Sequence, residues 1–484
     1  MYIFLVSLLG FILRITNIVK PEGLWNDEYV SWFIASIPFG QGFCQEILKQ
    51  CHMPLYYFYL KPFAQFGDTI LRLTSVFPSV LAIPVMYLIG KEYSEKCAKY
   101  SAIITSVLPF LVYYSQEVRL YSLVFLISSL LLLYIIRTLK NPCKKNIILY
   151  FVFSFTLIFT HVLGIFFVIL ITVYLIYKKN LLSKRNLFFL FSGFILVFPF
   201  GLIILKQLPS AQWWGIFSYT NIMFLFSDFL SPILSNHINA PPVFYYKTGL
   251  DFIFLITVPT LFGIAGIILG FKKCRGLILT VLGYIFVLAV ISCSGKLVFI
   301  TKYLTEILPV IILAISLGFD GNNKLKQLIL YAFVFINIIA VFFPVYPAKI
   351  FRIEGNRLPA VILNVQQPDR IIFTYYAPDR FERYLNTNAK LEYISKINRF
   401  DYIDNLKKIL NDIKSGENVS IVFLDSVSFI PENRIEEAET RNFPEMFITF
   451  SKIRHLLEIY VESNFNDVFI TKSGSWTILY GTKK

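Results

Sequence analysis

The first 345 residues of the chain alternate long apolar runs with short polar connections. Most of these runs approach the roughly 20 residues that an α-helix needs to cross the hydrocarbon core of a bilayer. By this length rule we predict about 11 spanning helices. They cover residues 2–19, 70–90, 98–114, 118–136, 147–160, 162–177, 186–206, 250–271, 276–292, 303–319 and 326–345.

The run at residues 147–177 is too long for one crossing and is interrupted by His161, with Gly164 close behind it. We predict a tight turn at His161 and two helices. One long tilted helix is the alternative, and it would reverse the topology of every later segment.

The charges of the connections test this split. The connections at alternate positions are rich in Lys or Arg: 91–99, 137–145, 178–185, 272–275 and 320–326. Because basic loops stay in the cytoplasm, the pattern favours the split and places the N-terminus inside. The long connections 20–69 and 207–249 and the C-terminal region then face outward.

Residues 346–484 differ from the rest, because charges return and the apolar runs become short. Strands are predicted at 370–376, 418–425, 467–471 and 475–481, and helices at 400–415 and 444–462. We expect a membrane domain at 1–345 and an extracytoplasmic α/β or α+β domain at 346–484. The fold class is thus a polytopic α-helical membrane protein with a C-terminal soluble domain.

Composition agrees with this fold class. Hydrophobic residues make up 56% and charged residues 15% of the chain, against about 25% charged residues in a soluble domain. The net charge of +15 indicates basic cytoplasmic loops and contact with anionic lipid rather than nucleic acid. The six cysteines form no CxxC pair; Cys44 and Cys51 share the first outer connection, where they form either a disulfide or two free thiols.

The first outer connection carries two adjacent carboxylates, Asp27 and Glu28, between aromatic residues in the stretch LWNDEYVSW. Such carboxylates are costly near a bilayer unless they are used. We interpret the pair as the mouth of a membrane-embedded active site; the alternative is a cap for a short helix that begins at Tyr29. Ser31–Ile37 and Leu55–Phe66 are predicted to be short amphipathic helices at the interface.

Stretches of the membrane domain resemble a known family. They are WNDEYVSW (25–32), the segment 51–93 that begins CHMPLYY, YYSQEVRLYSL (113–123) and TKYLTEILP (301–309). They are similar to the GT-C membrane glycosyltransferases, in particular the bacterial family 39 type related to protein O-mannosyltransferases and lipid A aminoarabinose transferases. Lys302 stands where the family usually has Arg, and Met53 replaces a family proline.

The resemblance implies transfer of a sugar from a polyprenyl-phosphate donor to an acceptor on the outer face, with inversion at the anomeric carbon. Asp27 is then the general base, and Glu28 is the second choice. Arg119 and Lys302 are the candidates to bind the donor phosphate. The alternatives are an ion pair of Arg119 with Glu117, and snorkelling of Lys302 to the interface.

The remaining candidates are expected to contact donor or acceptor, or else to pack at the interface: His52, Tyr57, Glu117, Tyr121, His161 and Tyr303. A divalent metal on the histidines with Asp27 and Glu117 is the weaker alternative, because no HExxH-type spacing supports it. No P-loop is present, so no nucleotide cofactor is expected. The rival functions are a lipid-linked oligosaccharide ligase or polymerase and a non-enzymatic transporter. We expect a bacterial inner membrane location, and the sequence leaves the sugar and acceptor open.

Overall fold

The computed structural model describes residues 1–16, 18–20, 23–49, 53–179, 217, 219–231, 253–294, 298–342, 357–373, 384–393, 408–424, 457, 459–461, 463–473 and 476–484. The chain forms two compact units. The first comprises Met1–Val19 and Val30–Lys349, and the second comprises Lys20–Tyr29 and Ile350–Lys484.

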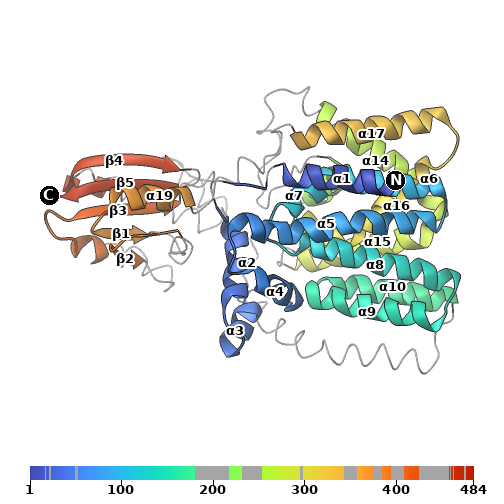
Figure 1. Cartoon of the computed structure of the whole chain (residues 1–484), viewed down its shortest axis with the longest axis horizontal. Coiled ribbons are helices and arrows are strands. Elements are labelled where there is room, and N and C mark those ends of the chain that lie inside the picture. Colours follow the sequence, from blue (N-terminus) through green and yellow to red (C-terminus); the bar gives the residue numbers. More distant parts are fainter. Residues whose placement is uncertain are drawn as a thin grey trace. The chain divides into compact units, whose positions relative to one another are not determined.

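The first unit is a bundle of helices (Figure 1). Within the described residues, 6 helices are long and apolar enough to cross a membrane, or up to 7 when a bent pair is one span. Its first half contains α1 (Tyr2–Ile15), α5 (Asp68–Lys91), α6 (Glu95–Val107), α7 (Pro109–Ser115), α8 (Tyr121–Lys140), α9 (Lys144–Thr160) and α10 (Gly164–Lys179).

The second half contains α12 (Tyr219–Leu230), the π-helical turn η3 (Ile253–Thr257), α14 (Val258–Gly270), the 3₁₀ turn η4 (Phe271–Lys273), α15 (Arg275–Cys293), the 3₁₀ turn η5 (Thr301–Ile307), α16 (Leu308–Phe319) and α17 (Lys324–Phe342). Every residue of α16 is buried, so this helix is the centre of the bundle. Helix α14 approaches it closely, since a methyl group added at Gly270 would clash with the carbonyl oxygen of Ala314. The predicted span 186–206 lies outside the described residues.

The predicted split at His161 is confirmed, because α9 ends at Thr160 and α10 begins at Gly164. The predicted single helix at 98–114 is wrong. Helices α6 and α7 meet at Leu108 with a bend of 52°. Pro109 explains the break, since proline has no N–H to donate and its ring clashes with the preceding turn. Helix α8 begins at Tyr121 rather than at 118, so Arg119 precedes the helix.

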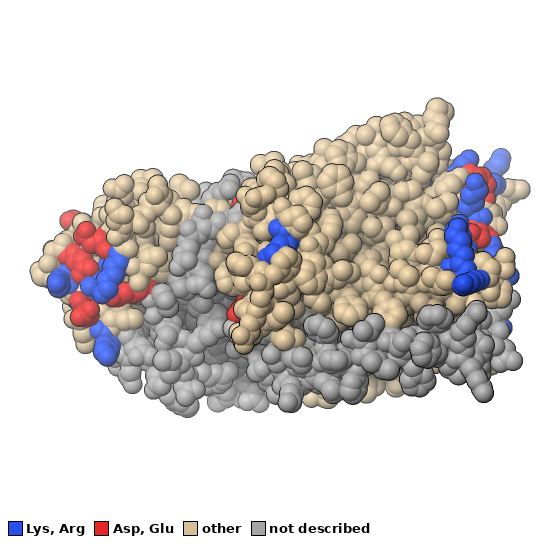
Figure 2. All heavy atoms as spheres, turned by 60° about the horizontal axis from the view of Figure 1, so that its bottom comes forward, with Lys and Arg blue, Asp and Glu red and all other residues tan. Residues whose placement is uncertain are grey.

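Four of the basic connections meet at one end of the bundle. Lys96 donates to Asn322, Lys273 lies 3.9 Å from Asp320, and Glu92 accepts from Arg137 and Lys140. These contacts join the connections 91–99, 137–145, 272–275 and 320–326. Figure 2 shows charged side chains gathered at this end of the helix bundle, whose described flank is otherwise nearly uncharged. The apolar flanks and the shared charged end make this a multi-pass membrane protein.

The connection after α1 folds into α2 (Asn26–Ser36), α3 (Gln41–Lys49), α4 (Leu55–Leu60) and the 3₁₀ turn η1 (Lys61–Phe63). The two predicted short helices are present, although α2 begins earlier than expected, and α3 was not predicted. Lys61 Nζ donates to the carbonyls of Ala35 and Ile37 at the end of α2. The same ammonium lies 4.5 Å from the ring centroid of Phe39, a cation–π contact that ties η1 to the segment between α2 and α3.

The second unit contains a mixed five-stranded sheet in the order β2-β1-β3-β5-β4. Its strands are β1 (Arg370–Phe373), β2 (Lys390–Tyr393), β3 (Asn418–Leu424), β4 (Phe465–Ser473) and β5 (Trp476–Lys483). Strand β1 pairs in parallel with β2 and β3, whereas β5 pairs antiparallel with β3 and β4. Four strands were predicted; β2 and helix α19 (Arg357–Gln366) were not.

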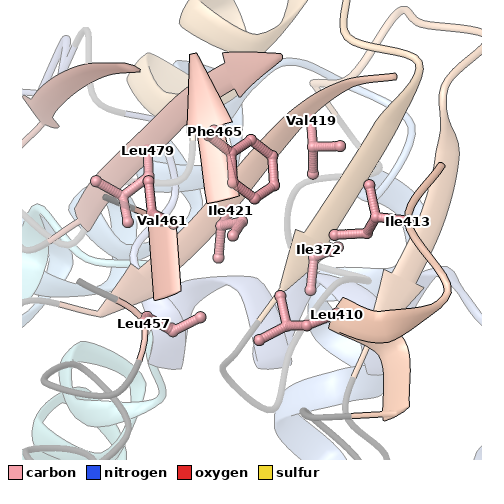
Figure 3. Close-up of a cluster of buried hydrophobic side chains, with 9 residues drawn as sticks. All are labelled: Ile372, Leu410, Ile413, Val419, Ile421, Leu457, Val461, Phe465 and Leu479. Atoms are coloured by element: carbon pink, nitrogen blue, oxygen red, sulfur yellow. The ribbon is translucent and has the colours of Figure 1, made fainter. Parts of the chain in front are cut away.

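Apolar side chains fill one side of this sheet (Figure 3). The cluster comprises Ile372, Leu410, Ile413, Val419, Ile421, Leu457, Val461, Phe465 and Leu479. The alternating residues of a strand point to opposite faces, so Val419 and Ile421 share this face while Val422 packs in a second cluster with Ala360 and Leu363 of α19. Both faces of the sheet are therefore covered. Of the predicted helices 400–415 and 444–462, most residues lie outside the described ones.

Candidate active site

Two buried cations converge on one aromatic ring in the first unit. Arg119 lies in the connection between α7 and α8, Lys302 lies on η5, and Tyr121 is the first residue of α8. Arg119 Cζ and Lys302 Nζ each lie 5.8 Å from the centroid of the Tyr121 ring. Arg119 is 6% exposed and Lys302 is 5% exposed. The site therefore holds two positive charges where water is largely excluded, and electrostatic interactions are stronger there than in bulk water.

Hydrogen bonds fix the position of Arg119. Its Nη1 donates to Ser31 Oγ of α2 at 3.2 Å. Its own carbonyl oxygen accepts from Ser75 Oγ of α5 at 3.3 Å, and its N–H donates to the carbonyl of Glu117 at 2.8 Å. One bond from α2 therefore holds the guanidinium and two bonds hold the backbone of Arg119, and Glu117 is buried in the same connection.

His161 and Glu306 form a buried pair next to the cations. His161 is the residue after α9, and its Nδ1 is hydrogen-bonded to Glu306 Oε1 on η5. The other carboxylate oxygen, Glu306 Oε2, has no hydrogen-bond partner among the described residues. The centroid of the Tyr303 ring lies 6.0 Å from that of His161 and 6.4 Å from that of Tyr121. Tyr303 therefore lies between the His161–Glu306 pair and the ring that the two cations contact.

The sequence reasoning did not single out Glu306. Its signal was a carboxylate inside the predicted span 303–319, which is rare in a membrane helix unless it is functional or paired. Asp228 on α12 was also missed. It is fully buried, and its Oδ2 accepts from Thr301 Oγ1 at 2.7 Å. A lone acidic residue in the apolar stretch LFSDFL could have identified it.

The acidic pair of the first outer connection lies in the first turn of α2. Glu28 Oε2 accepts from the backbone N–H of Trp25 at 3.3 Å. This contact is half of a capping box, in which the third helical residue reaches back to the N-cap N–H. Glu28, which is buried, therefore caps α2 as its third residue. The predicted alternative, a cap for a helix that begins at Tyr29, is wrong because the helix begins at Asn26. Asp27 is half-buried in the same turn.

The other predicted site residues are distributed as follows. Tyr57 is fully buried on α4 with its ring 5.6 Å from that of Tyr56. His52 and Cys51 lie outside the described residues. Within the part of the chain that the structure describes, no group of three or more His, Cys, Asp or Glu residues could hold a metal ion.

No protein-family model and no curated protein matches the sequence. Solved structures do match it. One is ArnT from Cupriavidus metallidurans bound to undecaprenyl phosphate, with 10% identity, a TM-score of 0.54, and coverage of 99% of this chain and 97% of that chain. Another is the Archaeoglobus fulgidus oligosaccharyltransferase tethered to an acceptor peptide, with 11% identity, a TM-score of 0.51, and coverage of 100% and 74%. These likenesses show the fold: the chain has the polytopic GT-C fold that its sequence predicted.

Proposed function

We propose that this protein is a membrane glycosyltransferase that moves a sugar from a polyprenyl-phosphate donor to an acceptor. The observation that carries the proposal is the convergence of Arg119 and Lys302 on Tyr121. The fold supports it, because the structure of ArnT with the same fold holds undecaprenyl phosphate. The proposed location is the outer face of a bacterial inner membrane, with the N-terminus and the shared charged end in the cytoplasm.

The leaving group of this reaction is a lipid phosphate, which gains negative charge as the bond to the sugar breaks. Preorganised cations stabilise such charge most strongly where water is excluded. The guanidinium of Arg119 offers two parallel N–H donors to phosphate oxygens, and the ammonium of Lys302 acts as a point charge. Both are buried, so bulk water screens their charges only weakly.

Asp27 is the proposed general base. An acceptor hydroxyl is a weak nucleophile, and a carboxylate can take its proton as it attacks. Helix α2 is continuous from Asn26 to Ser36, and residues four apart on a helix share a face. Asp27 therefore shares a face of α2 with Ser31, the residue that accepts from Arg119. Because Glu28 is engaged in capping α2, we assign the base to Asp27.

The proposed reaction is a single displacement. The acceptor oxygen bonds to C1 of the sugar while the bond from C1 to the phosphate oxygen breaks. The proton of the acceptor passes to Asp27, and the electron pair of the broken bond leaves with polyprenyl phosphate, next to Arg119 and Lys302. Attack opposite the leaving group inverts the anomeric carbon. His161, Tyr303, Tyr121, Glu117, Tyr57 and His52 are proposed to contact donor or acceptor.

The test is sugar transfer by the purified full-length protein in detergent, with a panel of synthetic polyprenyl-phosphate sugars. The wild type is expected to turn over at least one donor, and Asp27→Asn is expected to lose about 10²–10⁴-fold in kcat. Glu28→Gln is the matched control and is expected to retain most of the activity. Turnover with diphosphate-linked donors alone would instead establish the oligosaccharide ligase. Transport without transfer would establish the transporter.

A further inference from the structure

Arg14 is a fully buried arginine near the end of α1, inside the first apolar segment. Its Nη2 donates to the carbonyl of Thr105 at 3.0 Å, and its Nη1 donates to the carbonyl of Ser106 at 2.8 Å. Its Nε donates to Ser79 Oγ at 2.7 Å, and Nη1 also reaches the carbonyl of Gly10 at 2.9 Å. These partners are neutral oxygens, so Arg14 is not held as half of an ion pair with any of them.

The two carbonyls of α6 that Arg14 binds are those that the helix break leaves unpaired. In an unbroken helix the N–H of residue 109 would bond to the carbonyl of Thr105, and the N–H of residue 110 to that of Ser106. Pro109 has no N–H, and Leu108 turns the chain with an extended ψ of 118°. Unpaired carbonyls are costly in a membrane interior. Arg14 supplies the missing donors, and its positive charge faces the partial negative end of α6.

Helix α1 also holds the other side of the break, and Figure 1 shows α1 running beside α7. The side-chain amide of Gln116, the residue after α7, donates to the carbonyl of Leu13 at 3.4 Å. Leu13 packs with Val107 and Val112, one from each side of the bend. Gly10 leaves room for the guanidinium, since a methyl group there would lie 3.2 Å from Arg14 Nη1.

We propose that Arg14 is a positioning residue: it replaces the hydrogen bonds that the break at Leu108 and Pro109 removes from α6 and thereby sets the 52° bend that delivers Glu117 and Arg119 to the active site. This inference rests on the proposed function for its effect on the donor. The structural part of the proposal, that Arg14 compensates for the helix break at Pro109, does not depend on which reaction the protein catalyses.

The first test compares Arg14→Gln and Arg14→Lys with Ser79→Ala in the full-length protein. Loss of the two hydrogen bonds from the Arg14 guanidinium to α6 should misplace Arg119. A misplacement of about 1 Å costs on the order of 100-fold in rate. We expect Arg14→Gln to weaken the binding of undecaprenyl phosphate at least as strongly as turnover, and Arg14→Lys to weaken both less. Ser79→Ala keeps the bonds to α6 and should bind within about twofold of wild type, because removing one neutral partner leaves the carbonyls satisfied.

Hydrogen exchange gives a readout that does not depend on activity. Arg14→Gln is expected to speed amide exchange in residues 105–119 while α8 keeps its protection. Equal acceleration throughout the bundle would show a general loss of stability and would overturn the positioning role. Unchanged exchange at 105–119 in a folded Arg14→Gln protein would overturn it as well.

The second test uses Pro109→Ala, in which residue 109 regains an N–H for the Thr105 carbonyl. In that background Arg14→Met should lower the melting temperature much less than it does in the wild type, while phosphate binding stays impaired. An equal loss in both backgrounds would refute the coupling. If the wild type neither binds undecaprenyl phosphate nor transfers sugar, the proposed function fails, whereas the exchange and coupling results still decide the role of Arg14.

Discussion

His161 Nδ1 and Glu306 Oε1 form a hydrogen bond although 145 residues separate them in the sequence. The bond ties the turn after α9 to the 3₁₀ turn η5 that carries Lys302. Both side chains are largely excluded from solvent. The pair therefore fixes η5 relative to the first half of the bundle, at the place where Lys302 meets Tyr121.

Glu306→Ala leaves His161 buried without its acceptor and should lower the free energy of unfolding by about 1–3 kcal/mol, the usual penalty for an unsatisfied buried polar group. Glu306→Gln keeps an oxygen and should lose less. Thermal unfolding in detergent measures both variants. A double-mutant cycle with His161→Ala checks the pair: additive losses would show that the two side chains are not coupled.

Lys302→Met should weaken donor binding through loss of a charged partner of the phosphate. Hydrogen bonds to charged groups contribute about 1.5–3 kcal/mol, which corresponds to roughly 10–150-fold in Kd. Lys302→Arg should retain binding, because a guanidinium also contacts phosphate and stacks on the Tyr121 ring. Titration with undecaprenyl phosphate measures the affinity. If Lys302→Met binds as tightly as wild type, Lys302 does not contact the phosphate.

Asp27 and Glu28 are adjacent but should separate in their effects. Glu28→Gln weakens the contact with the Trp25 N–H and should cost about 0.5–1.5 kcal/mol of stability, the net contribution of one hydrogen bond. Asp27→Asn should lower kcat far more than it lowers stability. Paired measurements of melting temperature and turnover decide the matter. The reverse pattern would move the base to Glu28.

Glu92 makes stability depend on pH at the shared charged end. Burial raises the pKa of the Glu92 carboxyl, but hydrogen bonds from Arg137 and Lys140 outweigh it and hold the pKa below its usual value. A lowered folded-state pKa stabilises the protein above the unfolded pKa of about 4.3. This stabilisation disappears as pH falls through the folded-state pKa.

Glu92→Gln should therefore be less stable than wild type by up to about 1 kcal/mol at pH 7, since these side chains are partly exposed. Melting curves from pH 7 to pH 3.5 should show the difference shrinking at the acid end. A constant difference across this range would mean that the carboxylate charge does not contribute.

Arg370 anchors the parallel side of the sheet in the second unit. Its Nε donates to Glu417 Oε1 at 2.7 Å and its Nη1 to Glu392 Oε2 at 3.1 Å, with the side chain 5% exposed. Arg370→Met removes the buried partner of both carboxylates and should cost up to about 3 kcal/mol, since Glu392 keeps Lys390 and Glu417 keeps the N–H of Lys414. Asp412→Asn, at an exposed partner, is the control and should stay within about 0.5 kcal/mol. Amide exchange of β3 in the full-length protein reports both.

The sequence by itself determined the elements whose signals are local. Apolar length located the spanning helices, the alternating basic loops required the split at His161, and alternation in stretches such as NVSIVFL gave the strands. The short strand Lys390–Tyr393 was missed, because KLEY carries too little alternation to stand out. The stretches YYSQEVRLYSL and TKYLTEILP resemble patterns of the family, and this resemblance marks Arg119 and Lys302 as candidates. It can be recognised in the sequence because each pattern is one contiguous stretch.

Only the tertiary structure decided which of these residues meet. Glu306, Asp228 and Arg14 stand out in the sequence only as isolated polar residues in apolar runs, and this pattern is the same whether the residue snorkels to the interface or is satisfied inside. What distinguishes the two outcomes is a partner on a distant segment, such as Thr105 for Arg14 or His161 for Glu306. Pro109 lies inside the predicted span 98–114, and the direction of the chain beyond it depends on the donors that α1 brings to the broken end.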